Sequence, residues 1–228
     1  EQQRQPSKRE STKKPSFPLF AYWAFSHLLR AQAYDERKDY EKGLHHIKKY
    51  ADLSWVLDTD EETLKWKNKY EDWAVVNTYV NKLLSGEESV LPEYVAYISS
   101  RKDEVLPALD NILEAANRYQ FDVDDILEQF KEDISSYLEQ QKIEGFYTQR
   151  FITERFIHFS KELSVYFLTK GRFSDGFKFL LSCLEKSTLI NNKSYIIKCM
   201  RLFESYQEHS SFETKTAYRN LINEVDQD

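Results

Sequence analysis

Two stretches of this chain follow the same pattern, and together they decide the fold. The first stretch reads Tyr34-(x)5-Tyr40-x-x-Gly43-Leu44-x-x-Ile47-x-x-Tyr50, and the second reads Phe167-(x)5-Phe173-x-x-Gly176-Phe177-x-x-Leu180-x-x-Cys183. Each position of the second stretch lies 167 − 34 = 133 residues after its counterpart. Because apolar residues spaced three and four apart are typical of amphipathic helices, each stretch predicts the end of one helix, a turn and the start of the next.

Small residues stand at the positions where the two helices of each pair would meet. Gly43 and Gly176 each follow an aromatic residue by three positions, and a missing side chain there allows close helix packing. Ala31 and Ser164 are their small partners on the preceding helices, while Gly171 makes the turn of the second pair. The residues expected to hold the two pairs together are Ala31, Tyr34, Tyr40, Gly43, Phe167, Gly171, Phe173 and Gly176.

The composition extends this helical interpretation to the whole chain. Only 5 of the 228 residues are Gly and 5 are Pro, which argues against Rossmann folds, P-loop enzymes and hairpin-rich sandwiches. The 34 aromatic residues (15 Phe, 15 Tyr, 4 Trp) supply a core and argue against disorder. We therefore expect an all-α protein of about ten antiparallel helices, near 18–38, 40–53, 60–84, 91–100, 103–119, 122–137, 146–170, 173–187, 193–209 and 213–225.

The repeated pattern resembles the tetratricopeptide repeat, a helix–turn–helix unit of about 34 residues that stacks into a solenoid. The early Trp and the final Pro of that repeat are missing, so two generic helical hairpins remain the alternative. The resemblance implies a groove lined by the first helix of each pair. Its candidate residues are Phe25, Leu28, Gln32 and Asp35 in the first pair and His158, Lys161, Val165 and Leu168 in the last.

A wider resemblance covers residues 17–224. The segments 30–44 (RAQAYDERKDYEKGL), 49–55 (KYADLSW) and 91–95 (LPEYV) are similar to the C-terminal helical-repeat region of Bacillus-type transcriptional regulators, which carry an N-terminal Cro/CI-type helix-turn-helix domain. Peptide-sensing regulators of the Rgg and PlcR type share this architecture. The resemblance implies an effector-sensing and oligomerisation domain, active as a homodimer, that contacts DNA only through a helix-turn-helix domain absent from this chain.

The charge distribution agrees with that organisation. Residues 1–16 carry five basic and two acidic side chains, a net charge of +3, so the remainder carries −6 − 3 = −9. We interpret residues 1–16 as a basic flexible linker and 17–228 as the helical-repeat domain. An ordinary disordered terminus is the alternative for the arm. The acidic body is itself a poor surface for nucleic acid, since DNA binding requires Lys and Arg at the phosphates.

The peptide-sensing relatives hold a peptide backbone with Asn side chains on helices, because an amide offers both a donor and an acceptor. Asn77 and Asn81 are one helical turn apart and share a face, so they are the best candidates for that role here. Two solvated or locally bonded Asn side chains are the competing interpretation. The expected ligand is a short peptide or a protein segment bound in the groove.

Motifs of enzyme or metal chemistry are not evident in the sequence. The five His residues form no His-Glu-x-x-His motif, and the adjacent His45 and His46 point about 100° apart on a helix. We expect no metal, no cofactor and no enzymatic activity. Cys183 and Cys199 fall within apolar helical patterns and are expected to be reduced core residues of a cytoplasmic protein. No apolar run reaches the roughly 20 residues that span a membrane.

Two other functions stay open at this stage. The chain could be a tetratricopeptide scaffold that binds a partner protein, or the repeat domain of a response-regulator aspartyl-phosphate phosphatase whose catalytic bundle precedes it. The apolar residues of the last two helices offer either a cap or a dimer interface: Tyr195, Ile196, Met200, Phe203, Leu221, Ile222 and Val225.

Overall fold

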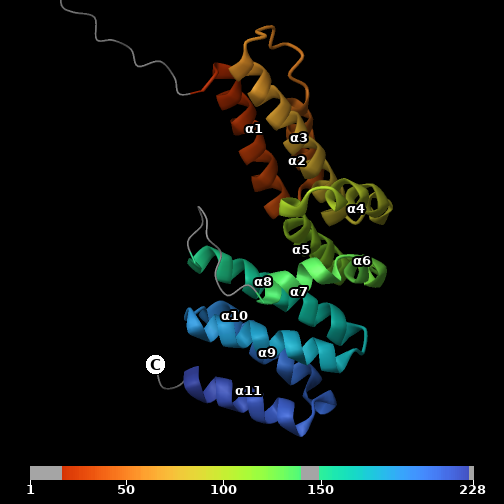
Figure 1. Cartoon of the computed structure of the whole chain (residues 1–228), viewed down its shortest axis with the longest axis vertical. Coiled ribbons are helices and arrows are strands. Elements are labelled where there is room, and N and C mark those ends of the chain that lie inside the picture. The colour runs from red at the N-terminus through yellow and green to blue at the C-terminus, as the bar shows by residue number, and fades with distance from the viewer. Residues whose placement is uncertain (1–16, 140–148, 226–228) are drawn as a thin grey trace, which may run out of the picture. The chain divides into compact units, whose positions relative to one another are not determined.

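The computed structural model describes residues 17–139 and 149–225, and in these ranges the chain is all-α with no strand (Figure 1). This confirms the predicted all-α fold of helical hairpins. The helices are α1 (Leu19–Glu36), α2 (Tyr40–Ala51), α3 (Glu61–Leu84), α4 (Leu91–Ser99), α5 (Lys102–Tyr119), α6 (Asp124–Gln129), α7 (Lys131–Glu139), α8 (Gln149–Thr169), α9 (Phe173–Leu189), α10 (Lys193–Tyr206) and α11 (Phe212–Val225). Short 3₁₀ turns, Glu88–Val90 and Gln207–His209, precede α4 and follow α10.

The chain forms two compact units, one ending at Asn81 and the other beginning at Lys82. The predicted helical-repeat domain, residues 17–228, spans both units. All four Trp residues of the chain, at positions 23, 55, 66 and 73, belong to the first unit, whereas both Cys residues belong to the second. Tryptophan fluorescence therefore reports on the first unit alone.

The first unit packs α1, α2 and α3 around one core (Figure 1). Tyr70 of α3 donates its hydroxyl proton to the carbonyl oxygen of Ala21 at 2.8 Å, while Tyr50 of α2 is completely buried beside it. The core residues are Phe20, Ala21, Ala24, Leu28, Ala31, Ile47, Tyr50, Leu53, Val56, Tyr70 and Ala74. Burial of this apolar area is the main term that stabilises the unit.

The second unit contains α4 to α11, and its best-packed pair is the antiparallel hairpin of α8 and α9. Helix α9 also contacts α10 and α11, and Figure 1 shows α9 and α10 between α8 and α11. Helix α5 packs against α8 on the other side. The core at the C-terminal end consists of Ile157, Leu168, Phe177, Leu180, Cys183, Leu184, Ile196, Cys199 and Phe203.

The contacts of the α1/α2 and α8/α9 hairpins correspond residue by residue. A Cβ atom added to Gly43 would overlap the carboxylate of Asp35, and one added to Gly176 would lie 2.6 Å from Cγ of Leu168. Asp35 and Leu168 are themselves 133 residues apart. Ser164 donates its hydroxyl proton to the carbonyl oxygen of Gly176 at 2.8 Å. Both glycines are thus sites of close helix contact, as their spacing predicts.

Both hairpins turn in the same way. In the first, the amide of Asp39 donates to the carbonyl of Tyr34 at 2.9 Å; in the second, the amide of Arg172 donates to the carbonyl of Phe167 at 2.8 Å. This six-residue closure requires a left-handed residue before the donor. Lys38 fills that position with φ 61°, where the second hairpin has Gly171. The side chain of Asp39 then accepts a hydrogen bond from the amide of Lys42, which confirms it as the cap of α2.

One expected helix is wrong in detail. The sequence predicts a single helix over 122–137 capped by Asp122, but the structure has α6 and α7 with a break at Phe130. Asp122 accepts a hydrogen bond from the amide of Asp124, whereas the residue preceding α6 is Val123. Leu127, Phe130 and Ile134 are all buried, so the apolar pattern identified the packed face but not the change of axis. The predicted start of the next helix, at 146, lies outside the described residues.

Candidate functional site

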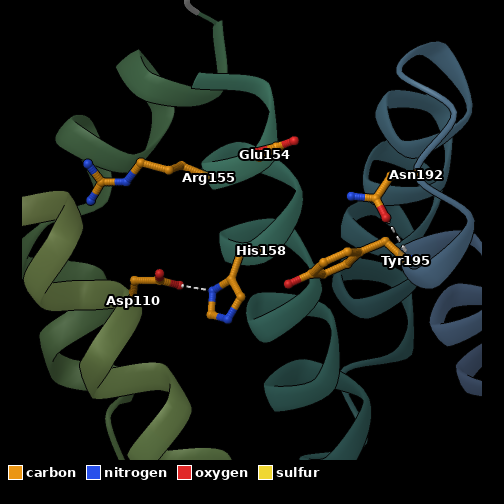
Figure 2. A pocket seen from close by; sticks show the side chains of 6 residues that line it. All are labelled: Asp110, Glu154, Arg155, His158, Asn192 and Tyr195. Atoms are coloured by element: carbon orange, nitrogen blue, oxygen red, sulfur yellow. Dashed lines mark hydrogen bonds and ion pairs between the residues drawn. The ribbon is translucent and has the colours of Figure 1, made fainter. Parts of the chain in front are cut away.

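An open cavity of about 490 Å³ lies in the second unit and is lined by side chains from three helices (Figure 2). Helix α5 contributes Asp110, α8 contributes Glu154, Arg155 and His158, and the start of α10 contributes Asn192 and Tyr195. Helix α8 is the first member of the α8/α9 hairpin, and α10 packs against both α8 and α9. The cavity therefore lies where α5, α8 and α10 approach one another.

His158 is fixed in the cavity by an ion pair. Its Nδ1 lies 2.7 Å from Oδ1 of Asp110, and its Nε2 lies 4.0 Å from Oε1 of Glu162. The hydrogen bond with Asp110 raises the pKa of His158 above its usual value, although burial of the ring acts in the opposite direction. The raised pKa favours the imidazolium form, and the ring lies between the carboxylates of Asp110 and Glu162.

Glu162, one turn after His158, anchors this group of charges. Its side chain is only 7% exposed, and it accepts hydrogen bonds from Lys161 at 2.6 Å and from Asn117 Nδ2 at 2.7 Å. The same Asn117 nitrogen donates to the carbonyl oxygen of Glu162 at 3.0 Å. A buried carboxylate is tolerated when such partners compensate for lost hydration. The arrangement fixes α5 against α8.

Tyr195 gives the cavity an aromatic wall. Figure 2 shows its side chain pointing from α10 toward His158 on α8, and the two ring centroids are 6.4 Å apart. Burial raises the pKa of Tyr195 to about 12, so its hydroxyl keeps its proton and remains a donor at neutral pH. Asn192 caps α10 by accepting a hydrogen bond from the amide of Tyr195 at 3.3 Å, which orients both side chains at the rim.

Asn77 and Asn81 share a face of α3, as their spacing predicts, but both amides are engaged inside the first unit. Asn81 is 2% exposed and donates to Oδ1 of Asp35 at 2.6 Å and to the carbonyl oxygen of Tyr40 at 2.9 Å. Asn77 donates to the hydroxyl of Tyr50 at 2.8 Å. The two amides join α3 to α1 and α2.

The other candidate residues are distributed over both units. Phe25 and Gln32 are exposed on α1, whereas Leu28 lies in the core of the first unit. Burial raises the pKa of Asp35 to about 6, while its hydrogen bond from Asn81 opposes that shift. Of the eight predicted groove residues, only His158 lines the cavity, and Lys161 lies one turn further along α8, paired with Glu162.

Five lining residues were not predicted as groove residues: Asp110, Glu154, Arg155, Asn192 and Tyr195. Tyr195 was predicted only as part of a cap or a dimer interface. Asp110 is 48 residues before His158, so no local motif connects them. Asn192 did carry a sequence signal, because an Asn just before a helical pattern is a favoured helix cap. In the structure, Asn191 before it is left-handed (φ 53°) and closes the preceding helix.

The first unit holds a separate pair of imidazoles. Nδ1 of His27 on α1 lies 2.8 Å from Nδ1 of His46 on α2. The ring of Tyr34 stacks on His46, and Trp23 packs edge-on against His27. Within 17–139 and 149–225, no three or more His, Cys, Asp or Glu side chains are grouped so that they could hold a metal ion. None of the helices in those ranges is long and apolar enough to cross a membrane.

Comparison of the chain with protein-family models gives no match, and comparisons with curated proteins and with solved structures give none either.

Proposed function

We propose that this chain is the effector-sensing and oligomerisation domain of a helix-turn-helix transcription regulator, and that the cavity between α5, α8 and α10 is its effector site. The observation that carries the proposal is the position and chemistry of that cavity. It is lined by α8, the first helix of the α8/α9 hairpin, and the groove predicted for a tetratricopeptide-like domain is lined by such first helices.

The lining suits a short peptide with free polar groups. His158 and the Tyr195 hydroxyl offer donors, the carboxylate of Asp110 offers acceptors, and the ring of Tyr195 offers an apolar surface. A peptide backbone presents donors and acceptors in alternation, so a surface with both recognises it independently of most side chains. The cavity is also open, which allows a chain longer than the cavity itself to extend beyond it.

Binding would act through shape. A ligand that contacts α5, α8 and α10 together favours the arrangement in which those helices are at their closest. The ligand can shift the equilibrium between two arrangements of the dimer only as far as its affinities for the two differ. The dimer would convert that shift into a change in the spacing of DNA-reading domains, and DNA half-sites respond to such spacing.

Affinity selection with a library of short linear peptides tests the effector site. We expect the chain to retain a defined set of peptides, and Tyr195→Ala to weaken their binding about tenfold, because an aromatic contact together with a hydrogen bond contributes roughly 1–2 kcal/mol. Tyr22→Ala is the matched control, since Tyr22 is an exposed tyrosine of the first unit. Retention of no peptide, or equal binding by Tyr195→Ala, contradicts the site.

The oligomeric and regulatory parts need their own measurements. Light scattering on the chain at micromolar concentration should give a dimer, and a monomer contradicts that part. A mobility-shift assay on the full-length protein, with and without a selected peptide, should show a change in DNA affinity. Retention of a folded partner protein that no peptide displaces would instead support the scaffold function.

A further inference from the structure

The two cysteines of the chain touch each other inside the second unit. Sγ of Cys183 on α9 lies 3.3 Å from Sγ of Cys199 on α10, and both residues are at most 1% exposed. Cys183 also donates to the carbonyl oxygen of Ile157 on α8 at 3.3 Å. The sequence places these residues 16 positions apart and gives no sign of a pair.

We propose that Cys183 and Cys199 form an oxidation site, at which a hydroperoxide joins the two thiols in a reversible disulfide between α9 and α10. A disulfide needs its sulfurs about 2 Å apart, so they must approach by roughly 1.3 Å. Adjacent helices can supply that movement through side-chain rotation together with a small shift of α10.

The chemistry needs only the two thiols and the hydroperoxide. The thiolate of one cysteine attacks a peroxide oxygen, the O–O bond breaks, and a sulfenic acid forms as the alcohol or water leaves. The second sulfur attacks the sulfenic sulfur, the S–O bond breaks, and a water molecule leaves with the remaining proton. Two thiols lose two electrons in total, and the peroxide accepts both.

The surroundings distinguish the two sulfurs. The pKa of Cys183 is lowered, because the thiol of Cys199 donates a hydrogen bond to its sulfur and Lys161 and His158 act in the same direction, although burial of the thiol opposes the shift. The pKa of Cys199 is raised, because it donates that hydrogen bond to Cys183 and is buried. Since the thiolate is the reactive form, we expect Cys183 to attack the peroxide and Cys199 to resolve the sulfenic acid, and trapping of the sulfenic acid in single-cysteine variants tests this assignment.

Access is controlled by the last helices. Tyr218 of α11 stacks on Phe203 of α10, with ring centroids 3.8 Å apart, and α11 packs along α9. A terminal helix opens more readily than the core of a domain, and hydrogen peroxide is small. We expect the pair to react through this opening more slowly than an exposed thiol would. The disulfide should form within one molecule and not between two.

The test treats the whole chain with hydrogen peroxide and follows intact mass under non-reducing conditions. We expect the monomer to lose two hydrogens, both thiols to resist alkylation after denaturation, and dithiothreitol to restore them. Peptide mapping should join the segments that contain Cys183 and Cys199. The oxidised chain should melt at a higher temperature than the reduced one, because the cross-link restricts the unfolded chain.

Single-cysteine variants identify the roles. With dimedone as the trap for sulfenic acid, Cys199→Ser should label at Cys183 faster than Cys183→Ser labels at Cys199. Circular dichroism confirms that each variant is folded, and the mass change of the unmutated chain stands whether or not they are. Thiols that remain alkylatable after peroxide treatment, oxygen addition without loss of two hydrogens, or cross-linking only between molecules would each overturn the proposal.

Discussion

Lys38 and Gly171 have the same backbone conformation at equivalent positions of two hairpins, with φ of 61° and 76°. Each is followed by an amide that closes the turn, and each stands 133 residues from the other. For an L residue the left-handed conformation costs free energy that glycine does not. The first hairpin therefore contains a strained turn where the second does not.

Replacing Lys38 with Gly should stabilise the first unit by about 0.5–1 kcal/mol, since relief of the left-handed strain exceeds the extra entropy of glycine in the unfolded chain. Urea unfolding followed by tryptophan fluorescence measures this. Gly171→Ala is the matched change in the second unit. A Cβ atom at position 171 meets nothing within 4 Å. Gly171→Ala should therefore lower the stability by about 1 kcal/mol through the backbone conformation alone, and urea unfolding followed by circular dichroism measures this loss. A destabilised Lys38→Gly chain would contradict the account.

Alanine at the two close-contact glycines should destabilise both units, but to different extents. At Gly176 the new Cβ lies 2.6 Å from Cγ of Leu168 and 3.0 Å from its backbone nitrogen, which cannot rotate away. We expect a loss of about 1–3 kcal/mol, as for other overpacked cores. At Gly43 the overlap is with the carboxylate of Asp35, a side chain that can turn outward, so the loss should be smaller.

A double-mutant comparison separates the two cases. In an Asp35→Ala background, Gly43→Ala should cost less, since the overlapping carboxylate is gone and only Nδ2 of Asn81, 2.9 Å from the new Cβ, remains close. In a Leu168→Ala background, Gly176→Ala should keep part of its cost, since the backbone contact remains. If Gly43→Ala lowers the stability equally in the unmutated chain and in the Asp35→Ala chain, the Asp35 carboxylate is not the obstacle.

The ionised carboxylate of Asp35 should lower the stability of the first unit at neutral pH. Its folded-state pKa of about 6 lies above the ordinary 3.8, so its favourable contribution is complete below pH 4 and is lost as the pH rises through 6. The amide of Asp35→Asn cannot ionise. At pH 8 the free energy of unfolding of this variant should exceed that of the unmutated chain by about 1–2 kcal/mol after allowance for solvent screening. The difference should shrink toward pH 4, by urea unfolding with tryptophan fluorescence. A difference that does not vary with pH would refute this.

His27 and His46 should make the first unit sensitive to acid. Burial and the neighbouring positive groups lower both pKa values below 6.5, Arg30 and Lys49 acting on each. Their contribution is therefore present above pH 6.5 and is lost as the pH falls through the folded-state values. His27→Gln should flatten the pH dependence of urea unfolding below pH 6.5. His209→Gln, in the second unit, should leave the fluorescence-detected curve unchanged.

In the second unit, Asp110 should hold His158 in its protonated form. The raised pKa of His158 means that the stabilisation is present below pH 6.5 and is lost as the pH rises through the folded-state value. Asp110→Asn should move the imidazole titration, followed by proton NMR, to lower pH. Asp122→Asn removes an exposed partner of Lys170 and is the control. An unmoved titration in Asp110→Asn would mean that the ion pair does not form in solution.

Much of the fold follows from local pattern. The repeated aromatic and glycine positions predict the hairpins because a helix contact needs a small residue opposite a large one, and Gly43 and Gly176 meet Asp35 and Leu168 at the same spacing. The break at Phe130 was not predictable in this way. Its neighbours are buried on both sides of the break, and burial repeats with the same period whether or not the helix axis changes direction.

The cavity was harder to predict than the helices. His158 could be placed by its position in the repeat, but its partner Asp110 lies on α5, which belongs to neither copy of the pattern. Asn77 and Asn81 share a face of α3 as their spacing requires, yet the spacing cannot distinguish a face that meets a ligand from one that meets Asp35 and Tyr50. Such pairings depend on how helices distant in sequence pack together.

The turns at Lys38 and Gly171 also bear on how quickly this chain folds. Each joins two helices that are neighbours in sequence, and the α1/α2 and α8/α9 hairpins are the best-packed pairs in their units. Contacts between sequence neighbours require short loop closures, and proteins rich in them fold in microseconds to milliseconds. We therefore expect each hairpin to assemble early and on its own, so that the slow steps of folding are those that bring α3 and α5 to their partners.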